Sequence, residues 1–344
     1  MPTASIDFTL ASIAMIIVTV VAISGTSMVI APHLDGDPSY FERYYQIGRY
    51  MLISKGDSPD WGNNETPNQL GFAAEDEPYN LNIDKVTRLN PKNNYAVTYS
   101  TLWQALGIDD VSFRISIKPL FELTLNEVSS QIQGEGTVYN FSTQTTRNGY
   151  PLSCYVSYYV VIGNSTYSSN GSTDSLGYGT VKITLPNSLN GMALLVVIAK
   201  AEESIVSYGV RPFGHQIGGP SLTGEYATLS PLDFNLTMNL EEGAVAWKTK
   251  AFTYSYSYNL TASGSFYAIP RVIERSPIII TLTGTNGSVS WVEWVAYPQV
   301  PLEVGADMED NYIVSDVCIV RYLVDINGVL YRFEIEFRSP GEYD

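Results

Sequence analysis

The chain has few of the residue types on which catalytic and metal sites are built. It contains two histidines and two cysteines, and it shows none of the spacings typical of zinc sites, P-loops, dinucleotide-binding loops or nucleophile elbows. Two cysteines exclude a disulfide scaffold, and Cys154 and Cys318 are expected either as buried thiols or as one long-range disulfide. The sequence therefore predicts no enzyme, no metal and no cofactor.

Basic residues are also scarce. The chain has 19 Lys and Arg against 35 Asp and Glu, which gives a net charge of −16. Because phosphate binding needs clustered Lys and Arg, we expect no nucleic-acid partner. Charged residues make up only 16% of the chain, whereas Tyr alone contributes 25 residues. Neutral polar and aromatic surface favours an extracellular β protein over a cytosolic enzyme.

The N-terminal region lacks charge almost completely. No Lys or Arg precedes Arg43, and residues 8–31 form an uncharged apolar run of 24 residues. As a helix this run would measure roughly 36 Å at about 1.5 Å per residue, enough to cross a bilayer core of about 30 Å. We therefore expect residues 1–34 to form a transmembrane or filament-core helix.

The start of this run and the segment after it carry a family resemblance. Asp7 stands directly before Phe8, as an acidic residue does at the head of the stem of type IV pilin-like proteins. Residues 50–62 (YMLISKGDSPDWG) resemble a segment that follows the stem in large archaeal pilin-like surface proteins. The segments that come next in the same order are 70–73, 83–86 and 113–117. The resemblance covers about residues 1–125.

The resemblance implies an assembly mechanism. Copies of the chain would reside in the membrane and then pack their N-terminal helices into a filament core, with Asp7 neutralising the N-terminal amine of a neighbour. A pilin leader normally ends in basic residues, and none is present here. A plain, uncleaved signal anchor therefore stays open as the alternative.

Seven N-x-S/T sequons lie after the apolar run, and none has proline in the middle position. They are Asn64, Asn140, Asn164, Asn170, Asn235, Asn259 and Asn286. If residues 8–31 anchor the chain, all seven lie on its outer side, so they are candidates for N-glycosylation. Chance occurrence in a chain rich in Asn, Ser and Thr is the alternative.

Residues 35–128 are expected to form a helical segment and the first strands of a pilin-like head. Apolar residues recur at helical spacing over 39–54, and Asn82 and Gly107 are placed to cap two further short helices. After Asp110 the period changes to two, which predicts half-buried strands around Ile115.

Residues 129–215 are expected to form a separate β-sandwich. The segments 146–159 and 172–185 resemble parts of immunoglobulin-like or peptidase-regulatory-like domains, with Asp174 and Gly177 in the tight turn before a strand. Residues 192–199 (MALLVVIA) predict a fully buried strand. Such modules serve mostly as spacers or binding units, so the resemblance indicates architecture rather than chemistry.

Residues 216–344 are expected to form a second β domain that ends in a hairpin. The hairpin covers 320–337 and turns at Asn327-Gly328, and we expect it to pair with the strands at 112–125 and to pack on the helix at 39–54. The predicted fold class is thus mostly β with an N-terminal α-helical stem: a long hydrophobic helix, short helices, and two β-sandwich-like domains.

Other candidate residues have weaker support. His33 and His215 have no partner at metal spacing, and His215 is placed in a Gly/Pro-rich loop. The acidic group Asp307, Glu309, Asp310 and Asp316 could hold calcium or simply face solvent. Tyr254, Tyr256 and Tyr258 could form a sugar-binding or subunit face, or an ordinary core. Trp291 and Trp294 lie on opposite faces of one strand, so at most one is in the core.

Together these features predict a structural subunit of an extracellular archaeal filament at the cell surface. Its partners are copies of itself and, before assembly, the membrane, and its β domains project outward for adhesion or bundling. The alternative is a monomeric, membrane-anchored binding module with a cell-surface or glycan partner. A surface hydrolase that uses His215 or the acidic loop is the third hypothesis.

Overall fold

The computed structural model describes residues 38–63, 65–75, 77–108, 111–217, 224–264, 266–306 and 317–338. The chain divides into two compact units, residues 1–47 and 48–344. In the first unit, the described residues are the beginning of helix α2 (Pro38–Ile53). The end of α2 and all the other described elements belong to the second unit.

The predicted fold class, with a long apolar helix before the β domains, is wrong for the described residues. None of the helices in the described part of the chain has both the length and the apolar character that crossing a membrane requires. Helix α2 has 16 residues and carries Glu42, Arg43 and Arg49. The run 8–31 lies outside the described residues. What the structure shows is a mostly β chain with several sheets.

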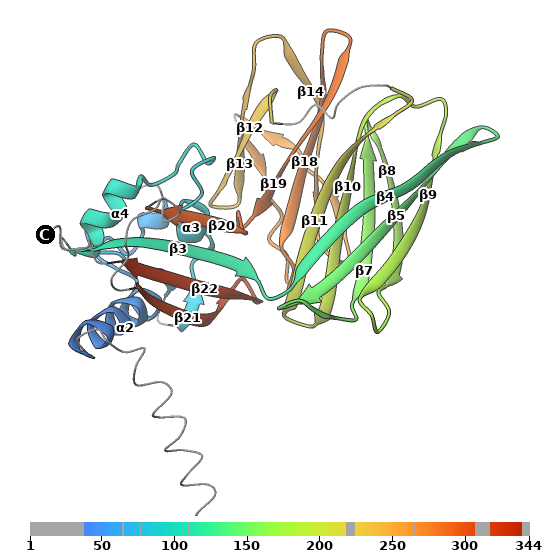
Figure 1. The fold of residues 1–344 in the computed structure, drawn as a ribbon. Helices are drawn as coiled ribbons and strands as arrows, with labels where there is room; N and C mark the ends of the chain where they lie inside the picture. The colour runs from blue at the N-terminus through green and yellow to red at the C-terminus, as the bar shows by residue number, and fades with distance from the viewer. Residues whose placement is uncertain are drawn as a thin grey trace, which may run out of the picture. The chain divides into compact units, whose positions relative to one another are not determined.

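One six-stranded sheet, here called the head sheet, joins segments from both ends of the second unit (Figure 1). Its order is β1 (Ala73–Ala74), β2 (Glu77–Leu81), β21 (Val317–Ile326), β22 (Val329–Arg338), β3 (Ser112–Pro119) and β20 (Leu302–Gly305). Strand β22 pairs antiparallel with β3 and sets Ile335 opposite Ile115. The final hairpin and the strand around Ile115 thus lie side by side, as their shared two-residue period indicated.

Short helices lie beside the head sheet. They are η2 (Trp61–Asn63), α3 (Ile83–Thr87) and α4 (Tyr99–Leu106). The Asn82 side chain accepts hydrogen bonds from the backbone N–H groups of Asp84 and Lys85, and Gly107 closes α4 in the left-handed conformation at φ 67°. Both caps that the sequence predicted are confirmed.

Trp61 contacts the segments on which the resemblance to pilin-like proteins is based. Its side chain is fully buried, and its indole Nε1 donates a hydrogen bond to the Gly71 carbonyl at 2.8 Å. Its ring meets Phe72 edge-on at 5.6 Å, and the Lys85 ammonium lies 5.6 Å from the ring centroid. Phe72 in turn contacts Phe333 on the head sheet. Segments 50–62, 70–73 and 83–86 therefore form one packed structure.

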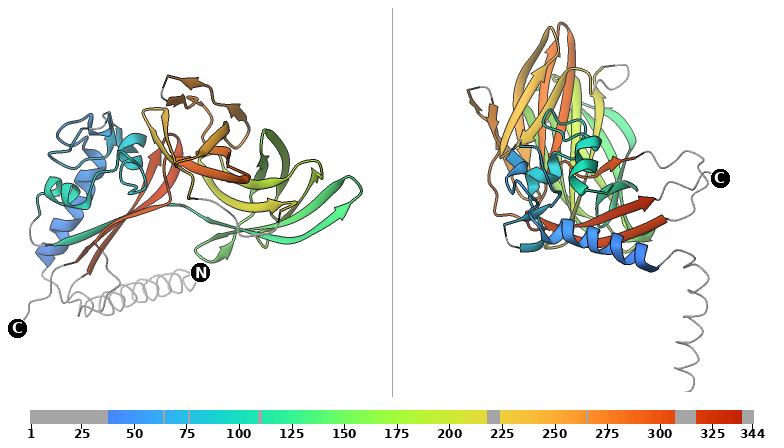
Figure 2. Two further views of the ribbon diagram at one scale, coloured as in Figure 1. Left: turned by 90° about the horizontal axis from the view of Figure 1, so that it is seen from above. Right: turned by 90° about the vertical axis from the view of Figure 1, so that its left-hand side faces the viewer.

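The first sandwich follows β3 without a break. One of its sheets contains β4 (Glu122–Gln133), β5 (Gly136–Arg147), β6 (Tyr150–Pro151) and β9 (Tyr178–Pro186). The other contains β11 (Ile205–His215), β10 (Gly191–Glu202), β7 (Tyr155–Ile162) and β8 (Ser165–Ser172). The boundary expected between residues 128 and 129 falls inside β4, and the β4–β5 hairpin projects beyond its sheet (Figure 2).

The second sandwich has two four-stranded sheets. One contains β12 (Ala227–Leu232), β13 (Asn235–Leu240), β17 (Phe266–Ala268) and β16 (Ala262–Ser263). The other contains β15 (Ser257–Asn259), β14 (Ala244–Phe252), β18 (Ile278–Asn286) and β19 (Val289–Tyr297). Strand β14 ends at Phe252, because the chain turns where the Thr253 N–H donates to the Tyr256 carbonyl.

The two sandwiches share a buried junction. Alternate residues of β10, including Leu195 and Val197, face the core of the first sandwich. The residues between them, including Val196, are also fully buried, and β10 contacts β19. Beside Val196 on the neighbouring strand, the Tyr159 ring lies 4.9 Å from Phe252 of the second sandwich. The predicted fully buried strand is confirmed, and the junction explains why both of its faces are apolar.

Candidate ligand-binding pocket

Several residues singled out from the sequence lie outside the described residues. These are the assembly candidates Asp7 and Phe8, the sequon Asn64, His33, and the acidic group Asp307, Glu309, Asp310 and Asp316. The filament-core and calcium hypotheses that rest on them stay predictions. Within the described ranges, no three His, Cys, Asp or Glu side chains are grouped so that they could hold a metal ion.

His215 has a structural role. It ends strand β11 rather than lying in a loop, and it is fully buried. Its Nδ1 lies 2.9 Å from the Tyr139 hydroxyl, and its Nε2 lies 3.0 Å from the Pro186 carbonyl. A neutral imidazole with its hydrogen on Nε2 donates to the carbonyl and accepts from the hydroxyl. Both ring nitrogens are thus engaged, which leaves none facing a substrate.

The six described sequons fall into two groups. Asn164, Asn170 and Asn259 are exposed. The other three donate hydrogen bonds through the side-chain amide nitrogen that a glycan would occupy. These are Asn140 to Ser129 Oγ, Asn235 to the Asp233 carbonyl and Asn286 to the Glu242 carbonyl. Glycosylation therefore stays a prediction, and the exposed group is sterically best suited to it.

The aromatic candidates do not share one face. Trp291 is buried in the core of the second sandwich, whereas Trp294 is 37% exposed, as their opposite parity predicted. Tyr254 lies under the Lys200 ammonium, Tyr258 packs against the second core, and Tyr256 is exposed. The Tyr256 and Tyr258 rings lie 6.3 Å apart, but Tyr254 faces Lys200 instead, so the three tyrosines do not form one face.

Both cysteines are buried free thiols. Burial raises the pKa of Cys154 to about 11, although hydrogen bonds with Thr145 and Thr173 act in the opposite direction. Burial also raises the pKa of Cys318. Since the thiolate is the reactive form, neither thiol has the properties of a nucleophile.

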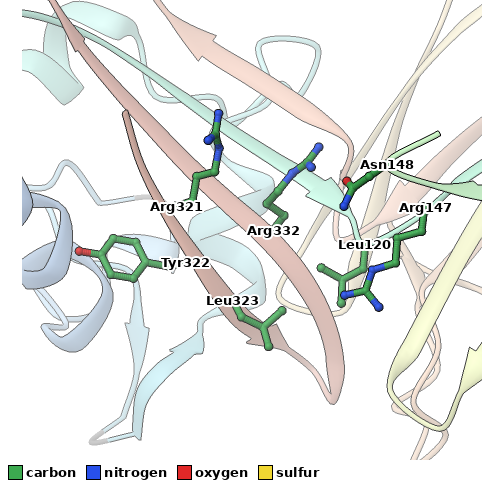
Figure 3. Close-up of a pocket in the computed structure, with 7 residues that line it drawn as sticks. All are labelled: Leu120, Arg147, Asn148, Arg321, Tyr322, Leu323 and Arg332. Carbon is green, nitrogen blue, oxygen red and sulfur yellow. The ribbon is translucent and has the colours of Figure 1, made fainter. Parts of the chain in front are cut away.

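A cationic pocket of about 270 Å³ lies where the first sandwich meets the head sheet (Figure 3). We call it the arginine pocket. Its lining consists of Leu120, Arg147, Asn148, Arg321, Tyr322, Leu323 and Arg332. Figure 3 shows Asn148 turned toward Arg332, whereas the Tyr322 ring points away from the arginines. Hydrogen-bond donors from three strands and a turn therefore line one cavity, with the Arg147 guanidinium beside Leu120 and away from that of Arg332.

Backbone geometry positions these side chains. Asn148 and Gly149 have φ values of 51° and 79°, which is the conformation of a tight turn between β5 and β6. This turn leaves Arg147 as the last residue of β5, directly opposite Tyr150. On the head sheet, Arg332 pairs with Leu323 on one side and with Lys118 on the other. Cross-strand partners share a face, so these three side chains lie on the same face of the sheet.

The arginines differ in their partners. Arg321 donates to Glu334 at 2.6 Å, which neutralises its charge locally. Within the described part of the chain, the guanidinium groups of Arg147 and Arg332 make no ion pair or hydrogen bond. By contrast, Arg114 nearby on the same sheet binds both Glu303 and Glu336. The pocket therefore holds two uncompensated positive charges in a strongly acidic protein.

No family model matches this chain, and no curated protein is significantly similar to it. Sequence reasoning missed the arginine pocket because its residues come from distant segments. The Arg147-Asn148-Gly149 turn was visible in the sequence, but its meeting with Arg332 was not.

Proposed function

We propose that this protein is a subunit of an extracellular surface filament of the archaeal pilin-like kind, assembled through its apolar N-terminal segment. The observation that carries the proposal is the uncharged run 8–31, headed by Asp7, in a chain whose remainder is acidic and polar. Burying such apolar surface contributes about 25 cal/mol per Å², which favours association of many copies.

The architecture of the β body supports this role. The two sandwiches bury strand β10 between them, and Met192 N–H donates to Ser290 Oγ across the junction at 2.8 Å. Thr283 Oγ1 donates to the Gly163 carbonyl in the same region at 3.0 Å. A junction that is both apolar and hydrogen-bonded resists bending better than a flexible linker does. Such a body suits a subunit that projects binding surface from a filament.

The experiment compares filament yield among full-length variants. Material sheared from cells that produce the protein is viewed by negative-stain microscopy with antibody against the β body. Asp7→Ala and deletion of residues 8–31 are expected to reduce filament yield strongly while the secreted body stays folded by circular dichroism. Glu122→Ala, which removes an exposed carboxylate on β4, serves as the control and is expected to leave the yield unchanged. Equal yields in all variants would overturn the proposal.

A monomeric, membrane-anchored binding module is the second candidate. The arginine pocket favours it, because a pocket with two unpaired cations is a feature of ligand recognition rather than of polymer packing. The sheared material and the detergent-extracted membranes from the same cells distinguish the two candidates. A chain that stays in detergent-extracted membranes as a monomer, with no labelled filaments, supports the binding module.

A further inference from the structure

We propose that the arginine pocket binds the carboxylate of an acidic saccharide, such as a uronic acid residue in a surface polysaccharide. The proposal rests on the proposed function in one respect: it names the ligand of a surface that is taken to act in adhesion. The pocket lies in the β-rich part of the chain after residue 47, so its binding is tested without filaments.

Charge distribution is the first argument. The chain has 11 arginines and a net charge of −16, yet three of the arginines line one cavity of about 270 Å³. Elsewhere, exposed arginines such as Arg271 and Arg275 have carboxylate partners, Asp233 and Glu203. A carboxylate ligand would supply the charge that Arg147 and Arg332 lack.

The donor geometry is the second argument. A guanidinium presents a planar fork of N–H groups that matches a carboxylate in a bidentate pair. Arg147 and Arg332 approach the cavity from different parts of the fold, and the Asn148 amide lies next to Arg332 (Figure 3). Guanidinium groups on two sides of one cavity, with the Asn148 amide beside one of them, suit a ligand that spans the cavity, with its carboxylate on one arginine and its hydroxyl groups on the other donors.

The apolar surroundings point to a sugar. Tyr150 is 76% exposed and lies directly opposite Arg147 across the β5–β6 turn. Leu120 and Leu323 add apolar lining. Sugar rings have an apolar face that stacks on aromatic side chains, while their polar groups take hydrogen bonds at the edge. Tyr150 does not line the cavity itself, but an exposed tyrosine opposite Arg147 at its margin fits a ring whose carboxylate enters the cavity.

The size and total charge exclude larger polyanions. Small-molecule pockets are typically about 300–1,000 Å³, so this cavity accommodates about one sugar unit. A nucleic acid presents phosphates along its whole length and needs many cations, whereas this chain has a net charge of −16 and repels it. A short acidic oligosaccharide carries few charges and meets much less of that repulsion.

The test uses the purified full chain in detergent and isothermal titration with tetragalacturonate at low salt. Binding is expected, and the fully methyl-esterified tetrasaccharide should bind at least about tenfold more weakly because a charge-assisted pair is lost. Arg147→Gln and Arg332→Gln should each weaken binding of the acid by about tenfold or more. Arg332→Lys should lose part of the affinity, because it keeps the charge without the fork.

The matched control is Arg271→Gln, an exposed arginine on the second sandwich, which should leave binding unchanged. The proposal is overturned if tetragalacturonate does not bind, if the ester binds equally well, or if both pocket variants bind as the native chain does. Hexaglutamate that binds as tightly as the sugar, with the same loss in both variants, would reassign the pocket to acidic peptides and also overturn the proposal.

Filament yield of the Arg147→Gln and Arg332→Gln chains separates this inference from the proposed function. Absence of sugar binding together with normal filaments refutes the ligand assignment alone. Sugar binding that depends on both arginines, together with an absence of filaments in every chain, supports the pocket and refutes the filament.

Discussion

Strands β10 and β21 are both rich in apolar residues, yet they have opposite surroundings. From Gly191 to Ala199, β10 is buried on both faces, one in the first core and the other at the junction with the second sandwich. Strand β21 alternates, and its outer residues Val317, Ile319 and Leu323 are exposed. Arg321 lies among them and pairs with Glu334. The first strand joins domains, and the second presents a surface.

The covering of a strand's two faces decides whether it joins domains or forms surface. Where both faces of a strand are covered by apolar residues, two domains are held as one body. Where one face carries ion pairs and exposed side chains, as around Arg321 and Glu334, that face stays accessible to water and to ligands.

A charge in the sandwich junction should have the largest effect. Val196→Asp places an unpaired carboxylate on the fully buried face of β10, and we expect the free energy of unfolding to fall by about 4 kcal/mol or more. Thr180→Asp, on the exposed face of β9, is the control and should change it by no more than about 0.5 kcal/mol. Urea unfolding followed by circular dichroism measures both. Similar small effects would mean that the sandwiches are not joined through β10.

Truncating the buried Trp61 beside the head sheet should cause the second-largest loss in the free energy of unfolding. Trp61→Ala removes a fully buried ring and its hydrogen bond to Gly71, and we expect a loss of about 3–5 kcal/mol. Trp294→Ala removes a partly exposed ring from β19 and should cost less than about 1.5 kcal/mol. Denaturant unfolding of the two variants under the same conditions makes the comparison. Equal losses of stability in the two variants would contradict the conclusion that Trp61 packs these segments together.

The outer face of the head sheet should respond to pH. Burial by itself raises the pKa of Glu336, but hydrogen bonds from Arg338 and Arg114 outweigh it, so its pKa is lowered. A lowered pKa stabilises the fold above the unfolded-state pKa, and that stabilisation disappears as the pH falls through the folded-state pKa. Glu336→Gln should therefore cost about 1–2 kcal/mol at neutral pH and progressively less in acid.

Glu334→Gln is the control for this experiment. Glu334 pairs with the well-exposed Arg321, so its replacement should cost less than about 0.5 kcal/mol. Unfolding curves recorded across the acid range measure both variants. A loss for Glu336→Gln that does not shrink at low pH would show that the ion pairs are not its cause.

Thiol reactivity should give the smallest effect, a difference in rate without a loss of stability. Cys154 lies in the core of the first sandwich with a pKa of about 11, and Cys318 lies on the inner face of β21 in the head sheet. Both should react slowly with iodoacetamide in the native state. We expect Cys318 to react before Cys154, because a sheet covered on one face opens locally more easily. Peptide mapping of alkylated protein checks the order, and the reverse order would contradict the contrast.

Local features of the fold could be predicted because nearby residues determine them. The hairpin turn at Asn327-Gly328, the helix cap at Asn82 and the opposite faces of Trp291 and Trp294 all follow from short-range geometry. Predictions failed where distant segments intervene. His215, expected in a loop, ends strand β11, and Tyr139 and Pro186 supply its hydrogen-bond partners.

A mostly β, acidic chain with defined turns and caps follows from local sequence patterns, because alternation and turn chemistry act over a few residues. The sequence also identifies the uncharged run 8–31. Only the tertiary structure decided which apolar faces are covered and that Arg147 and Arg332 border one cavity. Their proximity depends on how β3 leads into the first sandwich and on the pairing of β22 with β3, and no local pattern encodes either.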